Sequence, residues 1–291
     1  MRTAPLTLPS VIPVRAITAF RPLVWLGLAW RDMRRAGWVS FMHGFVVAMG
    51  GAAIIALAQQ RFWLLAGALS GFMVVAPVLA TSLYALSRAL ERKEQADWGV
   101  VLKTWFNWQN NHKNKFGHDY WCMVQFGALL GLAATGWVLT SAALITLFAP
   151  VPIQSPLDFV HHVVLAPDSW LFELWLALGG LMAAPMFASS VVSMPLLLDR
   201  HVTLKQAVLT SWRVVLTNPI PMAAWATIIM VFTMLGLGTI FLGLIAIIPL
   251  LGHASWHAYR ELVDVSGLQP RDTSSVPDVQ AAVTPRSGDP R

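Results

Sequence analysis

Charged residues are scarce in this chain, and none of them interrupts its longest apolar runs. Asp, Glu, Lys and Arg make up 12% of the 291 residues, whereas 56% are hydrophobic. Soluble globular domains usually have about 25% charged residues. A helix needs about 20 apolar residues to cross the hydrocarbon core of a bilayer, and several runs here exceed that length. The composition therefore excludes an ordinary soluble domain and predicts a polytopic membrane protein.

Cysteine is nearly absent as well. Cys122 is the only one, so the chain has no intrachain disulfide and no metal site built on paired cysteines. No acidic residue falls near the predicted middle of an apolar run, which argues against ion-coupled transport. The sequence also has no phosphate-binding glycine loop, nucleophile elbow or pair of catalytic carboxylates. We therefore expect a protein that is not an enzyme and that holds no cofactor.

The charge balance is basic, with a formal net charge of +6. On a soluble surface this excess would suggest a nucleic-acid partner, but beside a bilayer the expected partner is an anionic lipid headgroup. We therefore expect membrane lipids as partners and no nucleic acid. A homo-oligomer or a membrane protein partner is left open.

Six apolar segments are predicted as transmembrane helices. They cover residues 38–60, 62–87, 120–148, 171–198, 219–236 and 238–257. This gives an all-α polytopic membrane protein with six transmembrane helices in three hairpins, each preceded by an amphipathic interfacial helix. The membrane domain is predicted to run over residues 22–265. An irregular cytoplasmic tail, 1–21, precedes it, and a disordered cytoplasmic tail, 266–291, follows it.

The three interfacial helices each carry an apolar stripe beside polar or basic residues. The stripes are Leu23, Leu26, Trp30, Met33 and Gly37 in the first helix, Trp98, Val101, Leu102, Trp105 and Trp108 in the second, and Leu204, Val208, Trp212 and Val215 in the third. In the first helix, Asp32 is grouped with the neighbouring arginines on the polar side.

The distribution of cations predicts the orientation. Six spans would leave Arg61 as the only Lys or Arg on one side of the membrane. By the positive-inside rule, both termini are then cytoplasmic. Each cation near an anionic surface contributes about 1 kcal/mol to lipid binding. Five arginines are therefore candidates for holding lipid headgroups on that side: Arg31, Arg34, Arg35, Arg200 and Arg213.

Two segments share one helical pattern. Offsets of +4, +7 and +11 from a proline lead to Thr81, Tyr84 and Arg88 after Pro77, and to His253, Trp256 and Arg260 after Pro249. At 3.6 residues per turn, such positions lie along one face of a helix. We interpret the chain as internally repeated, with a unit of surface helix, span and span. The eight positions are the candidate polar or packing stripe.

The stripe leaves several functions open. In a small transporter or channel, Thr81 and His253 would line a polar cavity between helices opened at Pro77 and Pro249. In the simpler interpretation, the same side chains only pack helices together. His253 and His257 lie one turn apart and are weak candidates for a metal or haem in a respiratory-membrane accessory protein.

Four segments carry a resemblance to a known family. They are WLGLAWRDMRRA (Trp25 to Ala36), GFMVVAPVLATSLYALSRALE (Gly71 to Glu91), SMPLLLDRHVTLKQAVLTSWRVVLTNP (Ser193 to Pro219) and PLLGHASWHAYRELV (Pro249 to Val263). Together they resemble an uncharacterised bacterial family of predicted integral membrane proteins, domain of unknown function 2189, over about residues 20–263. The resemblance implies a multi-pass protein of the bacterial inner membrane. It assigns no activity and no catalytic residue.

The leading hypothesis is a non-enzymatic inner-membrane protein that organises the membrane or binds lipids or a partner protein. The sequence by itself does not define a more specific role.

Overall fold

The computed structural model describes residues 11–58, 67–68, 80–110, 121–167 and 170–271. The named helices are α1 (Arg21–Ala36), α2 (Trp38–Ala58), α4 (Trp98–Asn110), α5 (Trp121–Phe148), α6 (Pro156–Phe159), a π-helical turn (Val160–Val164), α7 (Leu171–Ser190), α8 (Ser193–Asp199), α9 (Leu204–Thr217), α10 (Pro219–Gly238) and α11 (Leu244–Leu262). Residues 80–91 are helical too. Within the described ranges, β-pairing is limited to two isolated bridges. The predicted all-helical class is confirmed.

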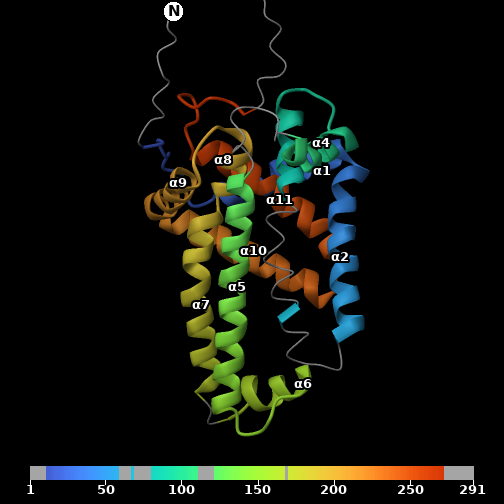
Figure 1. Ribbon diagram of the computed structural model, residues 1–291, viewed down its shortest axis with the longest axis vertical. Coiled ribbons are helices and arrows are strands. Elements are labelled where there is room, and N and C mark those ends of the chain that lie inside the picture. Colours follow the sequence, from blue (N-terminus) through green and yellow to red (C-terminus); the bar gives the residue numbers. More distant parts are fainter. Residues whose placement is uncertain (1–10, 59–66, 69–79, 111–120, 168–169, 272–291) are drawn as a thin grey trace, which may run out of the picture.

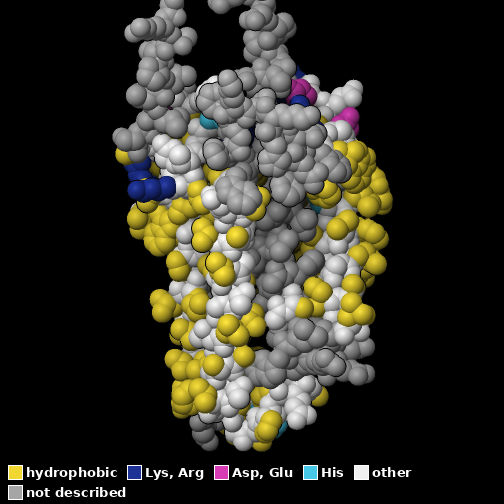
Figure 2. All heavy atoms as spheres, viewed as in Figure 1, with side chains coloured by type: hydrophobic (Ala, Val, Ile, Leu, Met, Phe, Trp, Pro, Cys, Tyr) yellow, Lys and Arg dark blue, Asp and Glu magenta, His cyan; other side chains and the backbone are white. Residues whose placement is uncertain are grey.

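The helices are arranged between two unlike ends. α2, α5 and α7 run along the long axis, α1, α4, α8 and α9 gather at one end, and α6 lies at the other (Figure 1). We call these the α1 end and the α6 end. In Figure 2 the visible Lys, Arg, Asp and Glu side chains lie at the α1 end, and hydrophobic side chains cover the length below it. This distribution is the one expected of a protein whose middle lies in lipid.

Within the part of the chain that the structure describes, four helices are long and apolar enough to cross a membrane. They are Trp38–Leu57, Cys122–Phe148, Leu171–Asp199 and Pro219–Gly238, which match the first, third, fourth and fifth predicted spans. The second predicted span, 62–87, lies mostly outside the described residues. The sixth, 238–257, overlaps α11, which is not among the four because its second half is polar. Six spans in three hairpins therefore stay a prediction.

Large apolar side chains point outward from the long helices. On α5, Leu132, Leu139 and Leu147 are exposed on one face, and Leu181 of α7 is exposed as well. Exposed leucines in such numbers are unfavourable in water and favourable in hydrocarbon. The helical backbone satisfies its own hydrogen bonds, as a chain inside lipid must.

α11 is the hub of the α1 end, and its largest contacts are with α1 and α2. Two glycines of α2 allow the close approach: Gly51 makes room for the Phe241 ring, and Gly44 faces the main chain at Ile245. Since both glycines lie in the middle part of α2, α11 begins about halfway along that helix. Accordingly, α10 and α11 run obliquely to the long axis, and their turn lies short of the α6 end (Figure 1).

The predicted apolar stripe of α1 lies only partly against the protein. The buried residues of α1 include Trp25, Ala29, Asp32 and Met33, whereas Trp30, from the predicted stripe, is 49% exposed. Asp32 is therefore on the inner face and not beside the arginines, since it follows Trp25 by two turns of helix. α1 has apolar residues on the face that contacts the protein and also at its exposed surface. The apolar stripe in the sequence therefore does not tell which face contacts the protein.

The predicted stripe of α9 lies partly against the protein. α9 buries Ala207, Thr210, Ser211 and Val214, and it leaves Trp212 of the predicted stripe exposed. Leu204, Val208 and Val215 of the stripe are half-buried and pack against the main hydrophobic cluster, so small and larger side chains share the contact with the protein.

The chain segments that flank the helices are held by hydrogen bonds at the α1 end. Residues 11–20 are largely irregular, and the Arg15 amide donates to the Leu262 carbonyl at 2.9 Å. Residues 266–271, predicted to be disordered, are ordered instead: Leu268 is buried, and the His201 amide donates to the Gln269 carbonyl at 3.0 Å. Residues 1–10 and 272–291 of the two predicted tails lie outside the described residues.

Candidate functional site

The two copies of the repeated pattern pack against each other in parallel. Leu83 lies on Gly252, where an added Cβ would come 2.5 Å from the leucine Cδ1. Eight residues further along both segments, Arg260 forms an ion pair with Glu91 at 2.8 Å. The internal repeat therefore corresponds to a real contact between residues 80–91 and α11.

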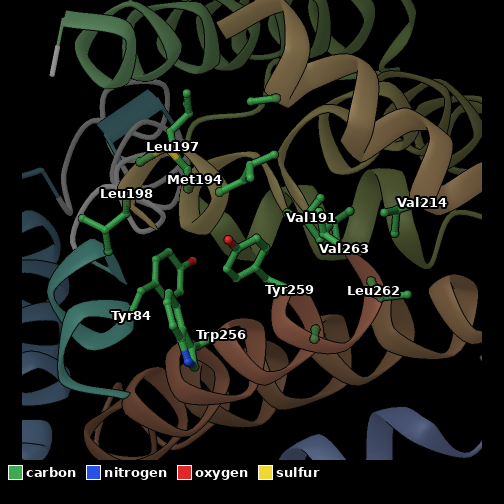
Figure 3. Close-up of a cluster of buried hydrophobic side chains, with 14 of the residues drawn as sticks. Tyr84, Val191, Met194, Leu197, Leu198, Val214, Trp256, Tyr259, Leu262 and Val263 are labelled. Carbon is green, nitrogen blue, oxygen red and sulfur yellow. The ribbon is translucent and has the colours of Figure 1, made fainter. Parts of the chain in front are cut away.

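The uncharged stripe residues that the structure describes are buried. Tyr84 and Trp256, which occupy equivalent places in the pattern, both belong to the main hydrophobic cluster (Figure 3). Thr81 is buried, and so is Pro249. Pro77 lies outside the described residues. This placement supports the packing interpretation of the stripe.

His253 stands at the centre of a chain of buried polar groups. Its Nε2 is 2.8 Å from the Ser40 Oγ, and its Nδ1 is 2.7 Å from the Ser87 Oγ. Ser87 donates to Asp32 Oδ2 at 3.0 Å, and the same oxygen is 2.8 Å from His257 Nε2. Four helical elements contribute: α1, α2, residues 80–91 and α11. We call these five residues the polar chain.

The donors of the polar chain have a defined direction. Ser87 has one hydroxyl proton, and it is donated to the Asp32 carboxylate, which can only accept. The Ser87 oxygen must then accept from the Nδ1–H of His253. In the neutral ring Nε2 carries no proton, so it accepts from Ser40. The hydroxyls and the imidazole thus point in one direction, from Ser40 towards Asp32.

Burial decides which chemistry the polar chain can perform. His253 and Ser40 have no exposed surface, so a substrate has no access to the serine as a nucleophile. The side chain of His257 is 16% exposed and joins the chain to the surface. The arrangement is therefore suited to moving a proton rather than to attacking a substrate.

Asp32 is the charged member of the polar chain. Its burial acts to raise the pKa of the carboxyl, but the hydrogen bond and charge of His257, with the hydrogen bond from Ser87, hold that pKa below its usual value. Asp32 therefore stays ionised at neutral pH in spite of its burial. The sequence pattern did not predict Asp32 as a site residue. Its spacing from Trp25 and Ala29 could have indicated its burial, because all three residues share one face of the helix.

A second buried carboxylate lies nearby. Asp199 accepts from the hydroxyl of Tyr259 at 2.8 Å and from Arg200 Nε at 2.9 Å. Arg88 and Arg92 lie further from it, at 3.9 and 4.0 Å. Burial of a carboxylate costs free energy unless cations and hydrogen bonds compensate, and this site supplies both. Asp199 thereby ties the end of α8 to α11 and to residues 80–92.

The five candidate lipid arginines divide into two groups. Arg31, Arg34 and Arg35 are exposed on α1, and Arg213 is exposed on α9. Arg200 is turned inward: its side chain is 15% exposed, and it also donates to the Leu268 carbonyl at 3.0 Å. The structure therefore leaves α1 with the densest set of outward cations among these candidates.

The weak metal candidates do not come together in a shared site. Both ring nitrogens of His253 are hydrogen-bonded to serines, and Nε2 of His257 is hydrogen-bonded to Asp32. Within the described part of the chain, no group of three or more His, Cys, Asp or Glu side chains is placed to hold a metal ion. Metal or haem binding therefore gains no support from this geometry.

The comparison with protein families bears on the same region. Residues 64–199 match the family model of DUF2189, described as a predicted integral membrane protein. The predicted resemblance is confirmed over these residues. The chain is thus an integral membrane protein with several apolar helices. The DUF2189 match contains residues 80–91 and Asp199, but α1 and α11 lie outside it. Of the five residues of the polar chain, only Ser87 lies inside the match. Comparison with curated proteins and with solved structures finds no match.

Proposed function

We propose that this protein is a non-enzymatic component of the bacterial inner membrane that binds anionic lipid headgroups at its α1 end. The observation that carries the proposal is the outward face of α1, where Arg31, Arg34 and Arg35 are exposed. Trp30 and Trp38 are exposed beside them, at 49% and 69%. None of the three arginines forms an ion pair with a described residue.

The three sides of α1 suit a position at the membrane surface. One side packs on the protein through Trp25, whose ring lies edge to face on that of Trp225 in α10 with the two ring centroids 5.6 Å apart. The arginines face water, and the exposed tryptophans provide indole rings, which favour the boundary between headgroups and acyl chains. Cations and indoles together would hold a headgroup phosphate and the glycerol region below it.

A topology accompanies this proposal. We place six apolar segments in the membrane as three hairpins, with both termini cytoplasmic. The third hairpin, α10 and α11, would enter the membrane from the α1 end and turn back within it. The contact of Phe241 with Gly51 supports this placement, since it puts the turn near the middle of α2.

The test compares two triple variants that remove the same charge. One is Arg31→Gln, Arg34→Gln, Arg35→Gln; the control is Lys93→Gln, Lys103→Gln, Lys205→Gln, which changes exposed cations outside α1. Binding of phosphatidylglycerol and cardiolipin is measured by native mass spectrometry from mild detergent. At about 1 kcal/mol per cation, the α1 triple should weaken lipid binding by about a hundredfold.

The control distinguishes a lipid site on α1 from a general attraction of anionic lipid to the positive charge of the protein. The proposal predicts a clearly smaller loss for the lysine triple, because those residues are spread over three places in the chain. Equal losses in both triples would mean that lipid responds to overall charge alone, and unchanged lipid retention in the α1 triple would refute lipid binding at α1.

A further inference from the structure

The polar chain links a fully buried imidazole to the surface, and lipid binding at α1 does not explain it. We infer that His253 is a proton-binding site inside the membrane domain, and that it exchanges protons with water at the α1 end through Ser87, Asp32 and His257. The ligand of this site is the proton itself. The inference is independent of the proposed lipid site, because none of these residues is among the exposed arginines.

The burial gradient gives the route its direction. His253 has no exposed surface, Ser87 is 1% exposed and Asp32 is 3% exposed. The side chain of His257 is 16% exposed and is the last group before the surface. Every step along the route is a hydrogen bond of 2.7 to 3.0 Å. A proton can therefore travel between His253 and the surface without any of the buried groups contacting water.

The proton transfers balance in three steps. When His253 is an imidazolium, its Nδ1 proton moves to the Ser87 oxygen while the Ser87 hydroxyl proton moves to Asp32 Oδ2, which leaves neutral His253, an intact serine and a neutral carboxyl group. Asp32 then gives this proton to Nε2 of a neutral His257 whose own proton is on Nδ1, so the carboxylate is restored and His257 becomes the imidazolium. Release of the Nδ1 proton to water completes the transfer and leaves the Nε2–H donating to Asp32. Uptake follows the same steps in reverse.

The charged surroundings of His253 come from the helices packed on it. Burial of the ring has the largest effect and disfavours the imidazolium, Asp32 faces the ring from α1 and favours it, and His257 from α11 and His43 from α2 disfavour it when they are charged. Nε2 of His43 lies 2.7 Å from the Ser82 Oγ, and its Nδ1 lies 2.8 Å from the Val39 carbonyl. α10 has no charged residue. Asp32 is thus the group that can offset the charge on His253.

The two serines on His253 provide a matched pair for the experiment. Ser40 and Ser87 are both buried and both hydrogen-bonded to the same ring, but only Ser87 lies between His253 and His257. A purely structural role of the network predicts similar effects for Ser40→Ala and Ser87→Ala. Proton exchange through the polar chain predicts an effect of Ser87→Ala alone.

The measurement uses the full-length protein, labelled with 15N-histidine and reconstituted in liposomes. Solid-state NMR follows the exchange of the His253 ring protons with water, and the His253 signals are assigned by their loss in His253→Gln. We expect Ser87→Ala to slow this exchange by about tenfold or more, which corresponds to the loss of roughly 1.4 kcal/mol. Ser40→Ala should keep the wild-type rate.

A second variant keeps the test decisive if Ser87→Ala does not fold. Asp32→Asn still offers an oxygen to Ser87 but cannot take up and pass on a proton as the carboxylate does, so it should slow the exchange as well. Equal rates in wild type and Asp32→Asn, or equal slowing in Ser40→Ala and Ser87→Ala, would overturn the inference.

Discussion

Replacement of Gly44 by alanine tests the contact on which the α1 end depends. A Cβ at this position would lie 2.6 Å from both the Cα and the carbonyl carbon of Ile245. Because these are main-chain atoms of α11, no side-chain rotation relieves the overlap. α2 and α11 must move apart, and this movement would also lengthen the hydrogen bond between Ser40 and His253.

The expected cost follows from the nature of the overlapping atoms. Overpacking of a tight contact usually costs about 1 to 3 kcal/mol, and contact with main chain places Gly44→Ala at the upper end of this range. The control is Gly131→Ala in α5, where a Cβ would meet no atom within 4 Å. In this control, alanine should stabilise the helix by roughly 0.5 to 1 kcal/mol relative to glycine.

A third variant provides an intermediate case. Gly252→Ala would meet side-chain atoms of Leu83, which can shift, so its cost should lie between those of the other two. Stability is measured as the temperature at which detergent-solubilised protein is lost from the monomer peak in size-exclusion chromatography. A Gly44→Ala protein as heat-stable as Gly131→Ala would refute the close α2 and α11 contact.

Three further predictions concern the acidic groups. Asp199→Asn leaves its arginines without their buried carboxylate and should cost about 3 to 5 kcal/mol by thermal unfolding, whereas Gln at the exposed Glu94 should change stability little. Asp32 has a folded-state pKa below its usual value, so the stability that its ionised form contributes is fully present above the usual pKa and is lost as the pH falls through the lowered pKa. Acid unfolding from roughly pH 5 to pH 3 should therefore be less steep in Asp32→Asn, and an unchanged slope would contradict the depressed pKa. Glu91→Gln should cost less than about 1 kcal/mol, since Glu91 is 44% exposed in its pair with Arg260, and a larger loss of melting temperature would show that this pair is more shielded than its exposure indicates.

The sequence predicts the long helices well because length and hydropathy are local properties. The runs that became α2, α5, α7 and α10 are apolar over about 20 residues or more, and no soluble helix needs such a run. The repeated pattern was also informative, since Tyr84 and Trp256 both belong to the main hydrophobic cluster. In both cases the signal lies within one segment or in the comparison of two segments.

The polar chain could not be predicted because its members are far apart in the sequence. The hydrogen bonds of Asp32 reach Ser87 and His257, which are 55 and 225 residues away. In addition, a helix at the membrane surface is apolar towards lipid and towards protein, so periodicity does not tell which apolar face packs. That ambiguity put Asp32 with the arginines, although it faces His257.

The most direct test of the account is the side of the membrane on which each end of the molecule lies. Single cysteines are introduced at Arg34 in α1 and at Asp158 in α6, in a Cys122→Ser background, and are exposed to a membrane-impermeant thiol reagent in sealed vesicles of one orientation. The account predicts that Arg34→Cys and Asp158→Cys react from opposite sides. Labelling of both cysteines from the same side would contradict a membrane domain lying between the α1 end and the α6 end.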